Sequence, residues 1–252
     1  MVVKSKRVKH ATRCDACSAR SVSLGALTYT FRVAPRVAID IPVCSAHSDQ
    51  VNANAASMKR LFITIDLPDN VRSAAAVVIR YLQKCAPILE TGRPSDLKPV
   101  KGISWVKPEN LHVTIKFLGD TDEETEAKLI EKLDRISSTY STFKLHLSKP
   151  EILGKRVMSI AVRSDTSTVF SLEMVIDTEC ERLGFKREGR RFHPHITLAR
   201  IRDPRASSDL VPQFSRLQFE SIEFDVREIV LYESKMMKAG SVYSKVRTFG
   251  LR

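Results

Sequence analysis

Hydrophobic and polar positions change period along the chain, and these changes predict a series of strands and helices. Residues 60–67 form an apolar, β-rich run, and apolar side chains then recur at helical spacing through 69–89, from Val71 to Leu82. Further strands are predicted at 103–106, 111–118, 143–147, 157–162, 195–201, 221–232 and 242–249. Further helices are predicted at 122–138 and 168–183, the first capped by Asp122 and the second ended by Gly184. This order predicts an α+β fold with mainly antiparallel pairing.

The first 57 residues have a different pattern. Two β-rich runs, 27–33 and 37–43, flank a short turn and predict a hairpin. Residues 45–58 are polar and rich in Ala and Asn, which predicts a short helix that fades into a linker. The predicted domains are 1–57 and 58–252, with an alternative start at Met58 left open.

Composition narrows the class of protein. Of 252 residues, 41 are Lys or Arg and 29 are Asp or Glu, a net charge of +12, and 43% are hydrophobic. The hydrophobic share is enough for a packed core. The positive charge favours an anionic partner, nucleic acid ahead of membrane. No apolar run approaches the roughly 20 residues of a membrane span, and no apolar segment follows the basic N-terminus as in a signal peptide. We therefore expect a cytoplasmic protein, and a monomer.

Two of the predicted strands share a His-x-Thr motif. The first is LHVTIKF, with His112 and Thr114, and the second is FHPHITLAR, with His195 and Thr197. Side chains alternate across a strand. The side chains expected on the core face are Leu111, Val113, Ile115, Phe117, Ile196 and Leu198. Those expected on the opposite face are His112, Thr114, Lys116, His195 and Thr197. Because both motifs have a similar strand–helix context, the sequence predicts an internal duplication.

Two imidazoles and two hydroxyls on one face suit phosphoryl chemistry. Attack on a phosphodiester needs a base on the nucleophile and an acid on the leaving oxygen, and two histidines can share that work near neutral pH. Threonine hydroxyls can donate to the non-bridging oxygens, where charge grows. Neither motif has carboxylates or cysteines at metal-ligand spacing, which disfavours a two-metal phosphodiesterase. His193 is expected to be a supporting or surface residue, and His146 a structural or solvent-facing one.

At these residues the sequence resembles the two-histidine (2H) phosphoesterases, in particular the RNA 2′,3′-cyclic phosphodiesterases, or 2′-5′ RNA ligases. The resemblance covers about residues 58–251 and includes RLFITIDLP, WVKPENLHVTIKFLGD, FHPHITLAR and IVLYESK. It implies a bilobal fold with two antiparallel sheets around a central cleft and helices outside. It also implies metal-independent hydrolysis of an RNA 2′,3′-cyclic phosphate to a 2′-phosphate, with 2′-5′ ligation as the reverse reaction.

The resemblance also implies roles for particular residues. His112 and His195 would be the acid/base pair, and Thr114 and Thr197 would bind the phosphate. The family uses an arginine after the second motif, here Arg200. Because strict alternation would put Arg200 on the core face, a bulge or a twist at the strand end has to turn it outward.

The cysteines predict a metal site apart from this chemistry. Cys14-x-x-Cys17 and Cys44-x-x-His47 form two ligand pairs, as in a zinc-ribbon-like module with structural zinc. The alternative is an accidental pair of cysteines or a reactive dithiol. This module would contact nucleic acid or a protein partner. Cys85 and Cys180 fall within predicted helices and are expected in the core.

The motifs and the resemblance leave three functional classes open. The first is the RNA cyclic phosphodiesterase, and the second is a phosphodiesterase for another cyclic or 2′-5′-linked nucleotide. The third is a non-catalytic RNA-binding protein that uses the same cleft. The intact histidines and threonines favour an enzyme, because Lys or Arg alone would serve for phosphate binding.

Overall fold

The computed structural model of the chain describes residues 12–13, 20–21, 58–91, 102–203, 210–218, 220–237 and 240–252, and side chains from residue 58 on except those of 85–91. Contacts divide the chain into two units, Met1–Ser48 and Asp49–Arg252. In the first unit the structure describes only β1 (Thr12–Arg13) and β2 (Arg20–Ser21), which pair antiparallel. The predicted hairpin at 27–33 and 37–43 and the predicted helix at 45–58, apart from Met58, lie outside the described residues.

The second unit is built on a nine-stranded sheet in which every pairing is antiparallel. Its strands are β3 (Lys59–Asp66), β4 (Ile103–Trp105), β5 (His112–Thr121), β6 (Phe143–Leu153), β7 (Val157–Arg163), β8 (His195–Ile201), β9 (Glu223–Val226), β10 (Glu228–Met237) and β11 (Gly240–Gly250). The helices are α2 (Asp69–Thr91), the 3-10 turn η1 (Pro108–Asn110), α3 (Glu123–Ser137), α4 (Thr168–Arg182) and α5 (Leu210–Arg216). The order is β11-β10-β3-β5-β8-β7-β6-β9, with β4 paired to β8.

The sheet consists of two similar halves. In one half, β3 is followed by helix α2 and then by β5, which pairs with β3. In the other, β7 is followed by helix α4 and then by β8, which pairs with β7. Strands β10 and β6 extend the two halves in the same way. This repeat is the form expected of the internal duplication, with one His-x-Thr strand in each half.

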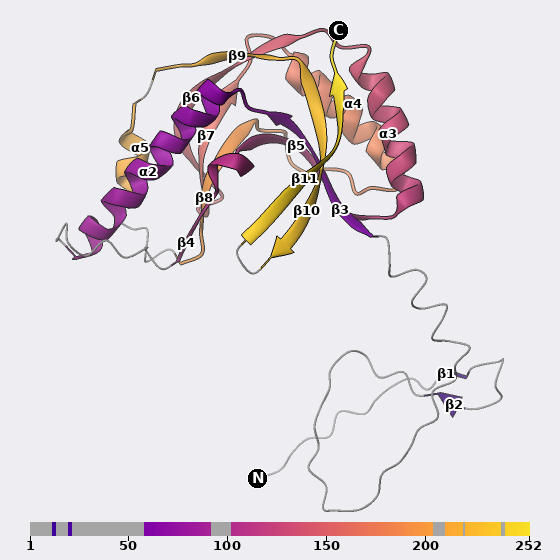
Figure 1. Ribbon diagram of the computed structural model, residues 1–252, viewed down its shortest axis with the longest axis horizontal. Helices are drawn as coiled ribbons and strands as arrows, with labels where there is room; N and C mark the ends of the chain where they lie inside the picture. The colour runs from indigo at the N-terminus through magenta and orange to yellow at the C-terminus, as the bar shows by residue number, and fades with distance from the viewer. Residues whose placement is uncertain are drawn as a thin grey trace, which may run out of the picture. The chain divides into compact units, whose positions relative to one another are not determined.

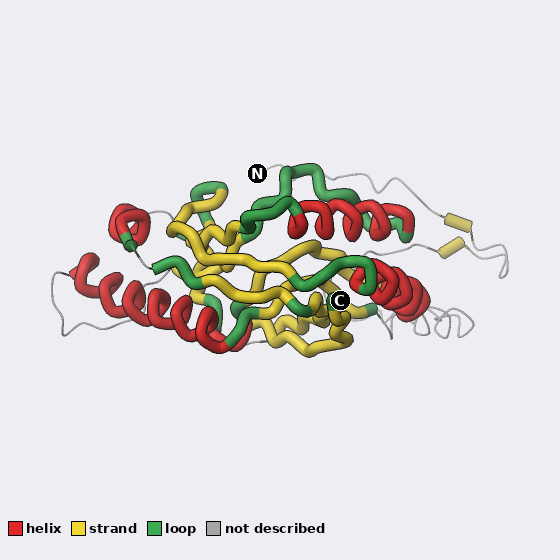
Figure 2. The backbone as a smooth tube through the Cα atoms, turned by 90° about the horizontal axis from the view of Figure 1, so that it is seen from above, coloured by secondary structure: helices red, strands yellow, loops and turns green. Residues whose placement is uncertain are grey.

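The family resemblance implied two antiparallel sheets around a central cleft, and the structure corrects this to one continuous curled sheet. The halves meet where β5 pairs with β8, through the single residue pair Val113 and Ile196. Helices cover the sheet in two groups, α2 with α5 and α3 with α4 (Figures 1 and 2). Helices α2 and α4 each connect two paired strands of their own half but also pack against the other half. Helix α2 contacts β8, and helix α4 contacts β5. Among the described residues, no helix is long and apolar enough to cross a membrane.

The core lies between the helices and the sheet. Leu61, Ile63 and Ile65 alternate along β3 and are almost fully buried, while Leu172 and Ile176 lie one turn apart on α4. This matches the strand and helix periods of the sequence. Cys180 is buried on α4, as predicted.

Most element boundaries agree with the sequence, and the differences have local causes. The side chain of Asp122 accepts a bond from the amide of Thr125 at 2.8 Å and caps α3. Gly184 ends α4 with a φ of 90°, a conformation that favours glycine. The single strand predicted at 221–232 is two strands, β9 and β10, which lie in different halves. Helix α5 was not predicted.

Two bulges in β5 change which side chains point outward. The pairs Thr64–Thr114 and Ile63–Lys116 leave Ile115 as an extra residue, and Leu118 is a second one. Alternation therefore breaks after Thr114. Lys116, expected beside the histidines, is only 3% exposed, and Phe117, expected in the core, is 62% exposed. Both expectations are wrong because strict alternation does not pass through a bulge.

The buried ammonium of Lys116 is paired. It contacts Oδ1 of Asp177 on α4 and donates to the carbonyl of Lys186 at 2.9 Å. Asp177 also accepts from the amide of Glu188 at 3.1 Å. Burial opposes ionisation of this carboxyl, but the bonds from Lys116 and Glu188 outweigh burial and lower its pKa. These contacts fasten the loop that leads into β8 to the strand that carries His112.

We expect Lys116→Met to lower the free energy of unfolding by about 3 kcal/mol, because the buried carboxylate of Asp177 loses its buried partner and keeps only the exposed Arg187 at 3.5 Å and the amide of Glu188. Lys116→Met combined with Asp177→Leu removes both charges and is expected to be less destabilised than the single variant. Urea unfolding measures both. Lys128→Met is the matched control, since the Lys128–Glu124 pair is exposed and is expected to change stability by less than about 1 kcal/mol. Equal losses in the single variant and the control would contradict the assignment.

Candidate functional site

The junction of β5 and β8 brings the two motifs together. Val113 and Ile196 are paired and fully buried, so their neighbours in sequence lie on the opposite, helix-free side. We call this side of β5 and β8 the histidine face. One position from the pair, Thr114 falls opposite His195, and His112 opposite Thr197. The two histidines are then diagonal neighbours, for which separations of about 7–8 Å are usual.

His112 is held in one orientation by its own strand. Its Nδ1 lies 2.7 Å from the carbonyl oxygen of Asn110, and its Nε2 lies 3.0 Å from Oγ1 of Thr114. Because a carbonyl only accepts, Nδ1 carries the proton. In the neutral ring Nε2 is therefore the nitrogen that can accept a proton, and it lies beside the hydroxyl of the same motif.

His195 is held in the same way. Its Nδ1 lies 2.7 Å from the carbonyl oxygen of His193, so Nδ1 again carries the proton and Nε2 remains for chemistry. In both motifs the carbonyl belongs to the residue two positions upstream of the histidine. His193 thus supports His195 through its backbone, while its side chain bonds to Glu151 at 2.7 Å. His146 lies elsewhere, 3.8 Å from Asp165.

Burial lowers the pKa of both motif histidines. For His112 the carbonyl of Asn110 and the charge of Asp66 oppose this, while Arg72 and His195 add to it. For His195 the carbonyl of His193 and the charge of Glu151 oppose it, while His193 and Arg200 add to it. Burial is therefore the largest effect on the pKa of each imidazole, and the charges around the histidine face modify it.

Arg200 reaches the outside through a bulge. The register between β7 and β8 shifts between Met158 and Ser159, and Leu198 is the extra residue. Leu198 and Ala199 are both buried, and Arg200 is exposed. Its charge acts on His195, so the bulge that the sequence analysis required places a cation near the second histidine.

A polar group next to His112 was missed by the sequence analysis. Asp66 is the cross-strand partner of His112. It accepts from the hydroxyl of Tyr232 at 2.9 Å and pairs with Lys245 at 3.1 Å. Alternation in RLFITIDL, which puts Phe62, Thr64 and Asp66 on one face, could have found it. Thr64 is fully buried opposite Thr114, and its hydroxyl makes no hydrogen bond in the described part of the chain.

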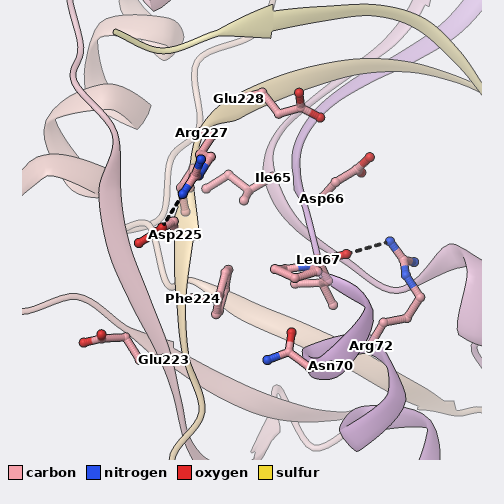
Figure 3. Close-up of a pocket in the computed structure, with 12 residues that line it drawn as sticks. Ile65, Asp66, Leu67, Asn70, Arg72, Glu223, Phe224, Asp225, Arg227 and Glu228 are labelled. Carbon is pink, nitrogen blue, oxygen red and sulfur yellow. Dashed lines mark hydrogen bonds and ion pairs between the residues drawn. The ribbon is translucent and has the colours of Figure 1, made fainter.

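A cavity of about 580 Å³ lies where β3 meets α2 (Figure 3). Its charged lining is mostly acidic: Asp66, Glu223, Asp225 and Glu228 against Arg72 and Arg227. Both arginines are already engaged. Arg227 bonds to Asp225, and Arg72 donates to four backbone carbonyls, those of Leu67, Pro108, Glu109 and Leu111. This cavity does not suit an anion, and Arg72 instead fixes the turn that leads into His112.

Comparison with known proteins agrees with this arrangement. A family model described as the 2′-5′ RNA ligase superfamily matches residues 89–236. The chain belongs to the 2′-5′ RNA ligase superfamily.

Members of the superfamily match over most of the second unit. A protein named RNA 2′,3′-cyclic phosphodiesterase from Archaeoglobus fulgidus is 30% identical over 195 residues, covering 75% of this chain and 99% of the relative. Another protein of that name, from Escherichia coli, is 28% identical and covers 77% and 97%. A crystal structure of a phosphoesterase has a TM-score of 0.56 and 25% identity, covering 77% of this chain and 98% of that one.

The two named relatives and the phosphoesterase structure each match about three quarters of this chain. Within the residues that the structure describes, no group of three or more His, Cys, Asp or Glu side chains is placed to hold a metal ion. The predicted zinc ligands Cys14, Cys17, Cys44 and His47 lie outside those residues.

We expect the imidazoles of His112 and His195 to titrate below pH 6.5 in the free protein, because burial disfavours their charged forms. The unfolded chain then binds more protons than the folded one, so stability is full above about pH 6.5 and falls as pH drops through the lowered pKa values. Arg200→Gln should raise the pKa of His195, while Arg182→Gln, on the surface of α4, should not. NMR titration of the ring protons measures both, and pKa values above 7 would contradict this account.

Proposed function

We propose that the chain is an RNA 2′,3′-cyclic phosphodiesterase that hydrolyses a terminal cyclic phosphate to a 2′-phosphate without a metal. The observation that carries this proposal is the Val113–Ile196 pair, because His112 and His195 are each one residue from it and act on each other electrostatically. Two imidazoles on either side of one phosphorus can serve the entering and the leaving oxygen in the same step. The named relatives support the substrate class.

In the proposed reaction, Nε2 of His195 takes a proton from water as its oxygen bonds to phosphorus. The bond from phosphorus to the 3′ oxygen breaks, and Nε2 of His112 gives that oxygen a proton. Thr114, Thr197 and Arg200 interact with the non-bridging oxygens, where negative charge grows. The products are a 2′-phosphate and a 3′-hydroxyl. The same displacement with a 5′-hydroxyl in place of water would form a 2′-5′ linkage, with the 3′ oxygen again leaving as a hydroxyl.

We expect His112→Ala and His195→Ala each to reduce turnover of a short RNA with a 2′,3′-cyclic phosphate by at least ~10²-fold, the usual scale of acid–base catalysis. The assay contains EDTA, and the product is identified by its retention time. His146→Ala is the matched control, because His146 lies away from the histidine face, and should stay within twofold of wild type.

Wild-type turnover in either motif variant would refute the paired mechanism. Loss of turnover in EDTA that returns with added metal would refute metal independence. Recovery of a 3′-phosphate would refute departure of the 3′ oxygen. Tight RNA binding with no turnover by the wild-type chain would instead support the non-catalytic alternative.

We also propose that residues 1–57 are a separate zinc-binding module, that 58–252 form the catalytic domain, and that the protein is a monomer. Three thiolates and one imidazole are a donor set that suits tetrahedral zinc. In a segment this short, the metal would supply much of the folding free energy. The module would contact RNA or a protein partner, away from the catalytic step.

Elemental analysis of protein purified under reducing conditions should give one zinc per chain. Cys14→Ser combined with Cys44→Ser should lose it, while Cys180→Ser, in the core of the other unit, should keep it. Absence of zinc from the wild-type protein would defeat the proposal.

A further inference from the structure

A cavity of about 370 Å³ lies where β7 ends and β8 begins. Its lining includes Ala161, which is the cross-strand partner of His195. It also includes His193, and the ring centroids of His193 and His195 lie 6.3 Å apart. Its two cations are Arg163 and Arg191, and we call it the Arg163 cavity. The cavity therefore adjoins the second motif without containing either of its side chains.

Both arginines of this cavity are open to a ligand. Each is exposed, and over the part of the chain whose side chains the structure describes neither pairs with a carboxylate. The guanidinium of Arg163 donates from Nε to the hydroxyl of Ser148 at 3.1 Å. The lining itself has no carboxylate, since Glu151 bonds to the ring of His193 and Asp165, in the turn after β7, is not part of it. Guanidinium groups in such a place suit phosphate oxygens.

The corresponding place in the other half of the duplication has the opposite charge. There the cavity where β3 meets α2 is lined by Asp66, the cross-strand partner of His112, and Ala161 has the equivalent position in the Arg163 cavity. The carboxylates of that other cavity outnumber its arginines, and both arginines are engaged. An anionic chain that continues from the histidine face is therefore attracted towards the side of His195.

The rest of the Arg163 cavity suits the neutral parts of a nucleotide. The rings of Phe170 and Phe192 meet edge to face, with centroids 6.0 Å apart, and give the cavity an apolar wall. Phe170 lies in the first turn of α4, which has no acidic residue, so the positive end of the helix dipole is at the same cavity. Cations beside an aromatic wall favour a nucleotide over a simple anion.

We propose that the Arg163 cavity binds an internucleotide phosphate of RNA, one nucleotide away from the phosphate that reacts between the histidines. This inference rests on the proposed function and names where the RNA chain continues beyond the reacting group. Arg163 follows Ala161, the partner of His195, by two strand residues, or about 7 Å, which is on the scale of one nucleotide. The phosphate belongs either to the strand that ends in the cyclic phosphate or to the strand whose 5′-hydroxyl is joined to it.

The first arm of the test concerns the strand that carries the reacting phosphate. Calorimetry compares adenosine 2′-phosphate with the dinucleotide adenylyl-adenosine that carries the same terminal 2′-phosphate, so the ligands differ by one nucleoside and one internucleotide phosphate. If the phosphate belongs to this strand, the dinucleotide binds the wild-type protein about 10- to 100-fold more tightly, the range of hydrogen bonds to charged groups. Arg163→Gln and Arg191→Gln should then each reduce this preference about fivefold or more.

The second arm concerns the strand that is joined. Protein saturated with adenosine 2′-phosphate is titrated with adenylyl-adenosine that has free 5′- and 3′-hydroxyls, and separately with adenosine. A preference for the dinucleotide that Arg163→Gln and Arg191→Gln reduce by the same factor assigns the phosphate to this strand. In either arm the preference should weaken with salt, with a slope of about 0.7 on logarithmic axes for one phosphate.

Arg227→Gln is the matched control, because it removes the same charge from the acidic cavity, and it should keep the wild-type preference. Thermal unfolding checks that each variant is folded. Equal affinities for the two ligands in both arms would overturn the inference, and so would a preference that both Arg163→Gln and Arg191→Gln leave unchanged. Failure of the proposed function is a different result, absence of turnover of the cyclic phosphate by the wild-type protein, and it leaves these binding ratios measurable.

Discussion

The site depends on one pair of residues in the middle of the sheet. Val113 and Ile196 join a half of four strands to a half of five, and the structure records a single paired position between β5 and β8. A shift of one residue in a strand turns every side chain to the other face. A slipped junction would therefore bury the histidines and expose the core. The register holds because both members of the pair are fully buried under helices that each half sends to the other.

The buried ion pair between Lys116 and Asp177 also connects the two halves near this junction. Lys116 belongs to the strand of the first motif, whereas Asp177 and the carbonyl of Lys186 belong to the helix and loop that precede the second. A charge pair in a core contributes little net stability compared with apolar side chains, but its geometry is demanding. Its effect here is to fix the approach of the loop to β8, and with it the carbonyl of His193 that orients His195.

Sequence patterns were enough for the strand–helix order, the capping of α3, the duplication and the face on which both histidines lie. Each of these follows from local periodicity. The patterns failed at the bulges, because an extra residue in a strand depends on its partner and leaves no mark in the alternation itself. For this reason Lys116 and Phe117 lie on the faces opposite to those predicted, and alternation alone would have put Arg200 on the core face. The joining of two sheets into one and the division of 221–232 into β9 and β10 are also set by pairing between distant segments.

The charges around each imidazole bear on which one is the acid. Asp66, opposite His112, raises the pKa of that ring, and Arg200, near His195, lowers the pKa of the other. A general acid must hold its proton before the reaction and a general base must not. In the proposed reaction His112 is the donor to the leaving oxygen and His195 is the base on water, and Asp66 and Arg200 act in the sense that these roles require. Arg72 and Glu151 act in the opposite sense, and the effect of Glu151 on His195 is larger than that of Arg200. Asp66, held by Tyr232 and Lys245, therefore contributes to the electrostatics of the first histidine, although none of these three residues stands in either motif.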